Sequence, residues 1–140
     1  MKHALPIAML ALTIGAADLT AQIPLSSYVR TFTSTMSRGY YFQAPAPFVV
    51  THCQVPDETS QGNQYVAIYK MTQSPPPFSQ TIQATPAFYS SGVKSDKIIP
   101  VLPPVVFKKD EWVAVLGTCG MSGGGSQGNS YGTAAFAGRI

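Results

Sequence analysis

The sequence predicts an all-β protein, a jelly-roll-like antiparallel β-sandwich of about seven to eight short strands. Proline recurs from position 24 to position 104 at intervals that leave little room for a helix of ordinary length. Between the prolines lie short runs of β-branched and aromatic residues. Because no helical segments alternate with these runs, the strands are expected to pair antiparallel rather than form a parallel sheet.

The first four expected strands are 28–36, 39–42, 48–55 and 64–71. Segment 28–36 alternates, and segment 39–42 is a short aromatic run. Segment 48–55 is apolar with a more polar end, and its alternation puts Cys53 on one face with Val49 and Thr51. Segment 64–71 sets Tyr65 and Tyr69 opposite Val66 and Ile68, which is the pattern of a strand with two different faces.

The remaining expected strands are 87–90, 98–107 with a break at Pro103 and Pro104, 111–118 and 131–140. Segment 87–90 is the weaker fifth strand. Segment 111–118 is the strongest, and its two faces are both apolar, so a central place in a sheet is expected. Trp112 lies inside that strand and is interpreted as a core residue. Small residues loosen segment 131–140.

The N-terminus has the order of residues that is typical of a secretory signal. Lys2 precedes an apolar run from Leu5 to Ala17, and small residues follow near its end. We therefore expect residues 1–21 to be a signal peptide, residues 22–140 to be a single β-sandwich domain, and the protein to be secreted. No later apolar run is long enough to span a bilayer, so no membrane span is expected in the mature chain.

Charge is sparse and scattered. Removal of Lys2 and Asp18 with the signal leaves eight basic and five acidic groups, spread along the chain. Nucleic-acid-binding proteins gather basic groups into a patch, so a nucleic-acid partner is not expected. The run Lys108-Lys109 is followed at once by Asp110-Glu111, and this quartet predicts a solvated turn.

Two cysteines remain in the mature chain, Cys53 and Cys119. An even count in an exported protein favours a disulfide. Both residues lie near strand ends on apolar faces, so a Cys53–Cys119 bridge is predicted if those ends are adjacent. Two buried free thiols are the alternative.

The glycine-rich stretch 119–132 matches two motifs of chemical interest. Gly120 to Gly124 fits the G-x-S-x-G of a nucleophile elbow, and Gly123 to Gly128 fits the G-x-G-x-x-G of a dinucleotide site. No acid or histidine follows Ser122, and no helix is expected after Gly128. We therefore interpret the stretch as a Gly/Ser loop that tethers the last strand.

Catalytic and metal-binding residues are weakly indicated. A hydrolase would have to use His52 as base, with Ser122 as nucleophile or with Asp57, Glu58 or Asp96 as its acidic partner. Asp57 and Glu58 in the 56–63 loop are a weak calcium candidate, because the loop lacks the regular acidic spacing of an EF-hand. No catalytic residue and no cofactor is predicted.

Tyrosines are the candidate ligand-binding residues. Exposed tyrosines on a rigid sheet can stack on sugar rings or anchor a partner at low entropic cost. Tyr40, Tyr65, Tyr69 and Tyr89 are the residues singled out for this role. The alternative for each is that it belongs to the core face of its strand.

Three longer stretches carry a resemblance to a known group of domains: Arg38 to Pro45, Gly62 to Tyr69, and Phe107 to Gly117. They resemble an uncharacterised group of secreted bacterial β-sandwich domains, with a G-Y-x-F-x-A-P strand and a strand ending in I/V-L-G. Asn129 to Gly132 resembles a late turn of that group. The resemblance covers most of residues 38–132 and implies a sandwich fold, but it brings no catalytic residues. Members continue past this turn into further strands, so an edge strand is expected to be missing or truncated after Ile140.

The function expected from these observations is a secreted, non-enzymatic binding or surface-structural module. Carbohydrate or another surface protein is the expected partner. The alternatives are a small secreted hydrolase that uses His52, or an accessory subunit that pairs with another chain through an open sheet edge.

Overall fold

The structure, a computed structural model, describes residues 30–34, 37–55, 62–77, 80–95, 97–120, 127–131 and 138–139, the first and the last two of these as backbone alone. The described residues form β-strands and no helix, so the predicted antiparallel β-sandwich is confirmed. The predicted signal peptide, residues 1–21, lies outside the described residues. The strands are β1 Arg30–Ser34, β2 Arg38–Gln43, β3 Phe48–Cys53, β4 Asn63–Met71, β5 Phe88–Lys94, β6 Ile99–Phe107, β7 Trp112–Gly120, β8 Gln127–Tyr131 and β9 Gly138–Arg139.

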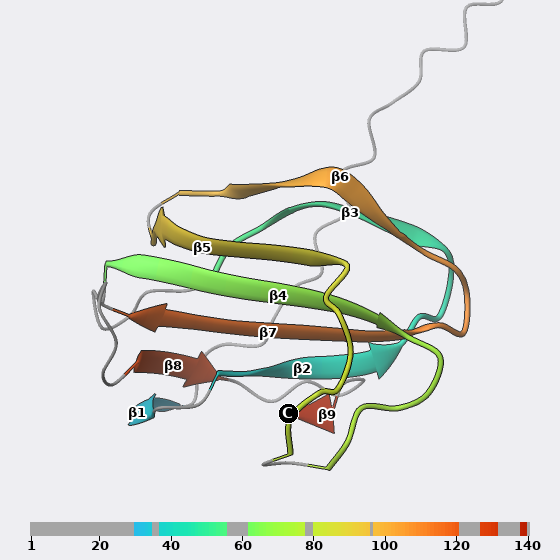
Figure 1. Cartoon of the computed structure of the whole chain (residues 1–140), viewed down its shortest axis with the longest axis horizontal. Coiled ribbons are helices and arrows are strands. Elements are labelled where there is room, and N and C mark those ends of the chain that lie inside the picture. The colour runs from blue at the N-terminus through green and yellow to red at the C-terminus, as the bar shows by residue number, and fades with distance from the viewer. Residues whose placement is uncertain are drawn as a thin grey trace, which may run out of the picture.

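The larger sheet is built around β7 (Figure 1). One edge of β7 pairs with β4 over its whole length, from Trp112 opposite Met71 to Gly120 opposite Asn63. The other edge pairs first with β2 and then with β8. Three strands lie beyond these neighbours. Strand β5 pairs with β4, strand β9 pairs with β2, and strand β1 pairs with β8. The central place expected for segment 111–118 is therefore confirmed.

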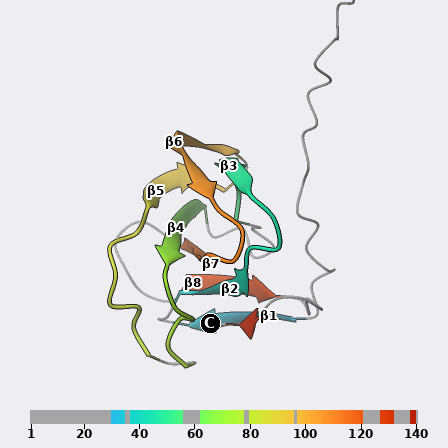
Figure 2. The same ribbon diagram turned by 90° about the vertical axis from the view of Figure 1, so that its right-hand side faces the viewer.

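The smaller sheet consists of β3 and β6 and forms a second layer over the larger one (Figure 2). Between the two layers lies the main core, because both sheets turn apolar side chains toward this space. Phe107 and Phe48 stack here with ring centroids 5.0 Å apart. The fully buried members of this core are Ala44, Val66, Ile68, Ile99, Val101, Val105, Phe107 and Val113.

One polar side chain is buried in the same region. Gln64 has no exposed surface, yet each end of its amide has a backbone partner. Its Oε1 accepts a hydrogen bond from the Val55 amide at 2.8 Å, and its Nε2 donates to the carbonyls of Lys94 at 2.8 Å and Lys97 at 2.5 Å. Gln64 therefore ties the segment after β3 and the β5–β6 turn to β4, the strand on which it lies.

The larger sheet has a second, smaller apolar cluster on its other side, which we call the outer face. Ile82 and Ala114 are buried there against Tyr41, Tyr69, Met71 and Leu116. Ile82 comes from the β4–β5 connection, residues 72–77 and 80–87, which crosses the front of the sheet in Figure 1. The connection thus covers part of a face that would otherwise be open to water.

Two bulges change the facing that strict alternation predicts. In β3 the register shifts between Val50 and His52, so Cys53 joins Phe48 and Val50 on the core side, while Val49 and Thr51 are exposed. The predicted shared face of Cys53, Val49 and Thr51 is therefore wrong, because the irregularity between them offsets the period of two. In β5 the register shifts at Gly92, whose φ of 77° is a conformation that glycine adopts readily.

Three strand boundaries also differ from expectation. The sixth strand is continuous through Pro103 and Pro104. Among the described strands β6 pairs only with β3, so it is an edge strand, where proline is tolerated because no partner needs its missing N–H. The fifth strand extends to Lys94, past the bulge at Gly92. Within the stretch interpreted as a loop, residues 127–131 form β8, which pairs with β1 through main-chain groups.

Candidate functional site

Three tyrosines share the outer face of the larger sheet. On β4, Gln64, Val66 and Ile68 are buried toward the core, so Tyr65 and Tyr69 lie on the opposite side. On β5, Phe88 packs against the main core, and the next residue, Tyr89, lies on the outer side. We call Tyr65, Tyr69 and Tyr89, together with Ala67 between them, the tyrosine face.

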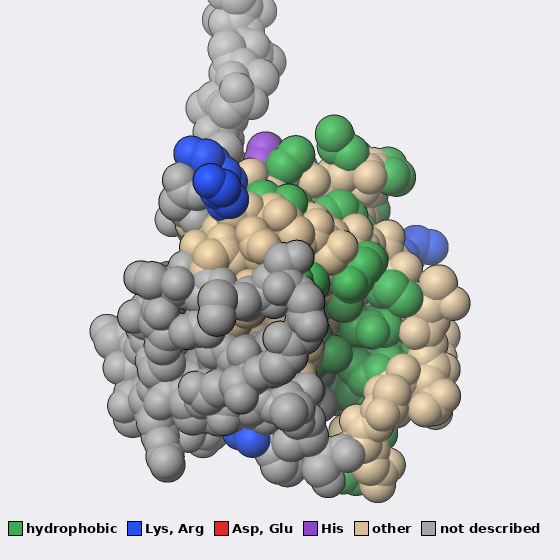
Figure 3. All heavy atoms as spheres, turned by 60° about the vertical axis from the view of Figure 1, so that its left-hand side comes forward, with side chains coloured by type: hydrophobic (Ala, Val, Ile, Leu, Met, Phe, Trp, Pro, Cys, Tyr) green, Lys and Arg blue, Asp and Glu red, His purple; other side chains and the backbone are tan. Residues whose placement is uncertain are grey.

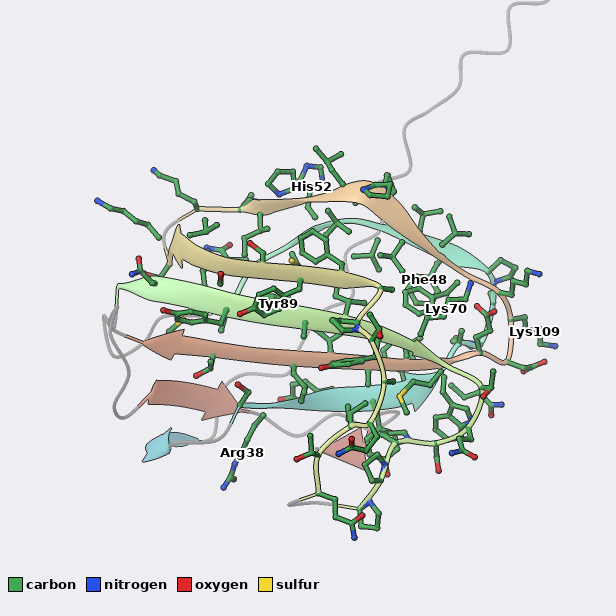
Figure 4. The ribbon with its side chains drawn as sticks, viewed as in Figure 1. Arg38, Phe48, His52, Lys70, Tyr89 and Lys109 are labelled. Atoms are coloured by element: carbon green, nitrogen blue, oxygen red, sulfur yellow. The ribbon has the colours of Figure 1, made fainter. Side chains whose placement is uncertain are left out.

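The register of β4 and β5 brings the three rings together. Tyr89 stands directly opposite Ala67, so it is a diagonal neighbour of Tyr65 on one side and of Tyr69 on the other. Diagonal positions of paired strands lie about 7–8 Å apart, within reach of aromatic side chains. Tyr89 is 61 % exposed, whereas Tyr65 and Tyr69 are half-buried. Figure 4 shows Tyr89 in front of the larger sheet.

The border of the tyrosine face is polar but uncharged. The β4–β5 connection passes along it and exposes Gln80, Thr81 and Gln83. Between Met71 and Val93 the sequence contains no Asp, Glu, Lys, Arg or His. Hydrophobic side chains gather on this side of the molecule in Figure 3, next to the tan chain of the connection. The site therefore combines aromatic rings with amide and hydroxyl groups.

Tyr40, the fourth tyrosine predicted for the site, lies elsewhere. It is opposite Val115 on β7, while its neighbour Tyr41 packs in the outer cluster. Tyr40 is therefore on the core side of β2 and is separated from the other three by the sheet. Tyr41 takes a place on the outer face instead, where its ring centroid is 6.0 Å from that of Trp112. Trp112, interpreted from the sequence as a core residue, is half-buried and contacts Tyr41 outside the main core.

The predicted disulfide is not formed in the structure, where Cys53 and Cys119 are both free thiols. Cys119 is buried, and its Sγ donates to the carbonyl of Val55 at 3.7 Å. The chain after β3 thus brings Val55 rather than Cys53 against this part of β7. Burial raises the pKa of the Cys53 thiol to about 11. Both cysteines consequently act as apolar side chains in a packed region.

His52 is exposed and has a hydroxyl, not a carboxylate, as its hydrogen-bond partner. Its Nδ1 is 3.1 Å from Oγ1 of Thr51, the preceding residue. The acid and nucleophile candidates Asp57, Glu58, Asp96 and Ser122 lie outside the described residues, as does the proposed calcium loop around Asp57 and Glu58. Among the described residues there is no group of three or more metal-ligating side chains. The hydrolase and calcium hypotheses stay untested predictions.

The predicted turn at Lys108 to Glu111 is held by a defined set of contacts. Glu111 Oε2 accepts a hydrogen bond from the Lys108 amide at 2.7 Å and is 3.1 Å from Nζ of Lys70. The pKa of Glu111 is lowered below its usual range, mainly by the hydrogen bond from the Lys108 amide and also by Lys70. Asp110, with a φ of 68°, donates its amide to the carbonyl of Ala44. The turn between the two sheets is thereby fastened to β4 and to the end of β2.

Sequence reasoning missed one surface altogether. On the side of β3 and β6 that faces away from the core, Val49, Ile98, Leu102 and Val106 are exposed. In the register break, residues 101–104 of β6 lie opposite the single residue Thr51 of β3, so strict alternation does not predict this surface. The usable signal was the density of aliphatic residues in 98–107.

The fold and site define a small antiparallel β-sandwich with an aromatic outer face. No protein-family model, curated protein or solved structure matches the chain. In the part of the chain that the structure describes, no helix has the length and apolar character needed to cross a membrane.

Proposed function

We propose that the protein is an exported carbohydrate-binding module that holds its ligand on the tyrosine face. The observation that carries the proposal is the grouping of Tyr65, Tyr69 and Tyr89 on adjacent strands, with Tyr89 61 % exposed. An isolated exposed tyrosine is ordinary, but Tyr89 is flanked by two half-buried tyrosines on the neighbouring strand, and the three together form a platform. Export rests on the signal-like residues 1–21, and the resemblance to secreted β-sandwich domains is consistent with it.

The shape of the platform suits a chain of sugar rings. Tyr65 and Tyr69 are four residues apart on β4, which corresponds to roughly 13 Å along a strand. Tyr89 stands level with the midpoint, opposite Ala67. Pyranose rings present C–H groups on their flat sides and hydroxyls at their edges. The tyrosine rings would contact the flat sides, while phenol, Gln and Thr groups accept and donate hydrogen bonds at the edges.

The chemistry of the border favours a neutral glycan over a charged one. Because no Asp, Glu, Lys, Arg or His occurs between Met71 and Val93, the connection offers no counter-charge for a uronate or sulfate group. A glycan bound through stacking and neutral hydrogen bonds should be insensitive to salt, because no ion pair is screened. Neutral β-glucans, mannans and xylans are therefore the first ligands to test.

Affinity electrophoresis of the full protein through gels that contain one neutral polysaccharide each is the direct test. Retardation by at least one neutral polysaccharide is expected. Tyr89→Ala should weaken binding about tenfold, because removal of a central aromatic anchor costs an interface more than ~1 kcal/mol.

The matched control is Val106→Ala, which truncates a side chain of similar exposure, 55 % against 61 %, on the other sheet. This variant should bind like the wild type. Lack of retardation by every neutral and anionic polysaccharide at high protein concentration would overturn the proposal. Equal binding by the wild type and Tyr89→Ala would remove the tyrosine face as the site.

A further inference from the structure

The β3–β6 sheet, with the residue that precedes β6, exposes four aliphatic side chains. Val49 is 51 % exposed, Ile98 63 %, Leu102 71 % and Val106 55 %. Among the described residues these are four of the five large hydrophobic side chains that are exposed, and the fifth is Tyr89 on the other sheet. Such a concentration marks a contact surface rather than ordinary scatter. We call these four residues the aliphatic face.

The aliphatic face is built by the register of two strands. Val49 stands directly opposite Val106, so the two side chains are cross-strand neighbours. In β6, Ile99, Val101, Val105 and Phe107 are buried inward, which leaves Leu102 and Val106 directed away from the core. Figure 2 shows this sheet as the outermost layer, and Figure 4 shows His52 on its outer side. The core lies between the aliphatic face and the tyrosine face.

Lysines stand at both ends of the face. Lys94 and Lys97 precede β6, Lys108 and Lys109 follow it, and all four are exposed. Among the described carboxylates, Asp110 lies beside Lys109, and Glu111 is bound to Lys70 and to the Lys108 amide; Asp96 is outside the described residues. Lys94, Lys108 and Lys109 therefore place positive charge at both ends of the aliphatic face. Figure 3 shows basic but no acidic side chains on the side that it draws.

The backbone of β6 is also suited to an apolar contact. Pro100, Pro103 and Pro104 are exposed and have no N–H group. An N–H without a partner is costly to remove from water, so its absence lowers the cost of covering this strand. The same prolines make β6 a poor edge for pairing with a strand of another protein. The alternative function, an accessory subunit that adds a strand of another protein to an open sheet edge, is therefore not favoured at the edge formed by β6.

We propose that the aliphatic face is a docking surface for an anionic lipid bilayer, independent of the proposed glycan site. Aliphatic side chains would enter the boundary between headgroups and acyl chains, and the lysines at both ends would contact anionic headgroups. A second copy of the chain fits less well, because two such faces would bring lysine-bearing ends together. A protein partner fits less well too, because the face lacks the Trp, Tyr and Arg anchors of protein interfaces. The tyrosine face would then be directed away from the bilayer.

Co-sedimentation of the full protein with vesicles tests this proposal. The vesicles contain phosphatidylcholine alone, or phosphatidylcholine with phosphatidylglycerol as the anionic lipid. The protein is expected to pellet with the anionic vesicles and to remain in solution with the neutral ones. Binding should fall as salt is raised, because the lysine–headgroup attraction is screened.

Variants separate the two contributions to binding. Leu102→Ser with Val106→Ser should weaken partition into anionic vesicles at least about tenfold, since two apolar side chains no longer leave water. Lys94→Gln with Lys97→Gln should weaken it by about fivefold per lysine. Tyr89→Ser is the matched control, because it also replaces an exposed hydrophobic side chain by serine, but on the larger sheet. This variant should bind anionic vesicles as the wild type does. The altered side chains are exposed, so unchanged circular dichroism and thermal midpoint should confirm the fold.

Three results would overturn the proposal. The first is absence of the wild type from the anionic pellet. The second is full binding by the Leu102→Ser, Val106→Ser variant, which would reduce the interaction to charge alone. The third is a wild-type dimer in solution that this variant abolishes, which would assign the face to a second copy.

Discussion

At the scale of single residues, Gln64 is a buried side chain that joins separate segments of the backbone. It is a fully buried amide that accepts one bond from the segment after β3 and donates two bonds to the β5–β6 turn. Burial of an amide is tolerated only when its hydrogen bonds are made, and here they join three segments of the fold. No aliphatic residue of the same size could replace these bonds.

Gln64→Ala is expected to lower the free energy of unfolding by about 3 kcal/mol, because it removes three buried hydrogen bonds, to the Val55 amide and to the carbonyls of Lys94 and Lys97. Gln54→Ala is the matched control. Gln54 donates to the Ser95 carbonyl at 3.1 Å but is exposed, so its loss should cost about 0.5 kcal/mol or less. Urea denaturation of both variants measures the difference. Similar midpoints for the two variants would show that the Gln64 bonds contribute little.

Glu111 makes stability depend on pH. Its folded-state pKa is lowered, first by the Lys108 amide and then by Lys70. A lowered pKa stabilises the folded state above the unfolded-state pKa, and this stabilisation is lost as pH falls through the folded-state value. Glu111→Gln should therefore be less stable than the wild type at neutral pH, and the difference should shrink in the acid range below the usual carboxyl pKa.

Urea midpoints of the wild type and Glu111→Gln, measured from neutral pH down to about pH 2, test this expectation. Asp110→Asn is the control, because it removes a neighbouring charge, leaves the Glu111 contacts in place and tolerates the positive φ of 68°. A difference between wild type and Glu111→Gln that stays constant with pH would contradict the argument.

At the scale of elements, β2 is held unusually close to β7 at one glycine. A Cβ added at Gly39 would lie 1.7 Å from the carbonyl oxygen of Val115, so the strand pair could not keep its position. The aromatic residues after it, Tyr40, Tyr41 and Phe42, depend on this pairing for their facing. Glycine is therefore required at position 39 because the backbone of β7 approaches it too closely for a side chain, and not because of a positive φ.

Gly39→Ala should destabilise the protein by about 3 kcal/mol, because the clash is with backbone and not with the end of a flexible side chain. Gly62→Ala is the comparison. Its added Cβ would meet nothing within 4 Å, so only the strain of a φ of 93° is incurred, about 1 kcal/mol. Thermal unfolding of the two variants should rank them in this order. A smaller loss for Gly39→Ala would mean that β2 can move away from β7 at little cost.

At the scale of the whole molecule, packing replaces the covalent link that the cysteine count predicted. Cys53 and Cys119 are free, and the sandwich is joined instead by its shared core and by the Gln64 and Glu111 contacts. A reductant should therefore leave the thermal midpoint unchanged. At neutral pH the native protein should react slowly with a thiol reagent, because the pKa of Cys53, about 11, keeps its sulfur protonated.

Thiol titration before and after unfolding, without reductant, measures this. Both cysteines should react slowly in the native protein and rapidly once it is unfolded. An intact mass lower by two hydrogens, with no thiol titrating after unfolding, would show that the bridge forms after all. Cys119→Ser would then distinguish the two cases, because it would remove the sensitivity to reductant that only a bridged protein has.

Much of the fold could be predicted because its signals are local. The period of two in 64–71 correctly separates Val66 and Ile68 from Tyr65 and Tyr69, and the apolar run 111–118 correctly predicts a central strand. The candidate site was predicted only in part. Tyr65, Tyr69 and Tyr89 lie together because Tyr89 pairs with Ala67, and Tyr40 is excluded because β2 turns it to the other side. Strand facing can be read from neighbouring residues, whereas pairing between distant strands cannot.

The sequence by itself determined that this chain folds as an antiparallel β protein, since its prolines prevent helices and its short apolar runs alternate. Only the tertiary structure decided which residues meet. A single irregularity between Val50 and His52 moved Cys53 into the core, and Val55 took the place beside Cys119 where a bridge was expected. The physical reason is that register depends on the total packing of both sheets, so one extra residue in a strand reverses the facing of all that follow.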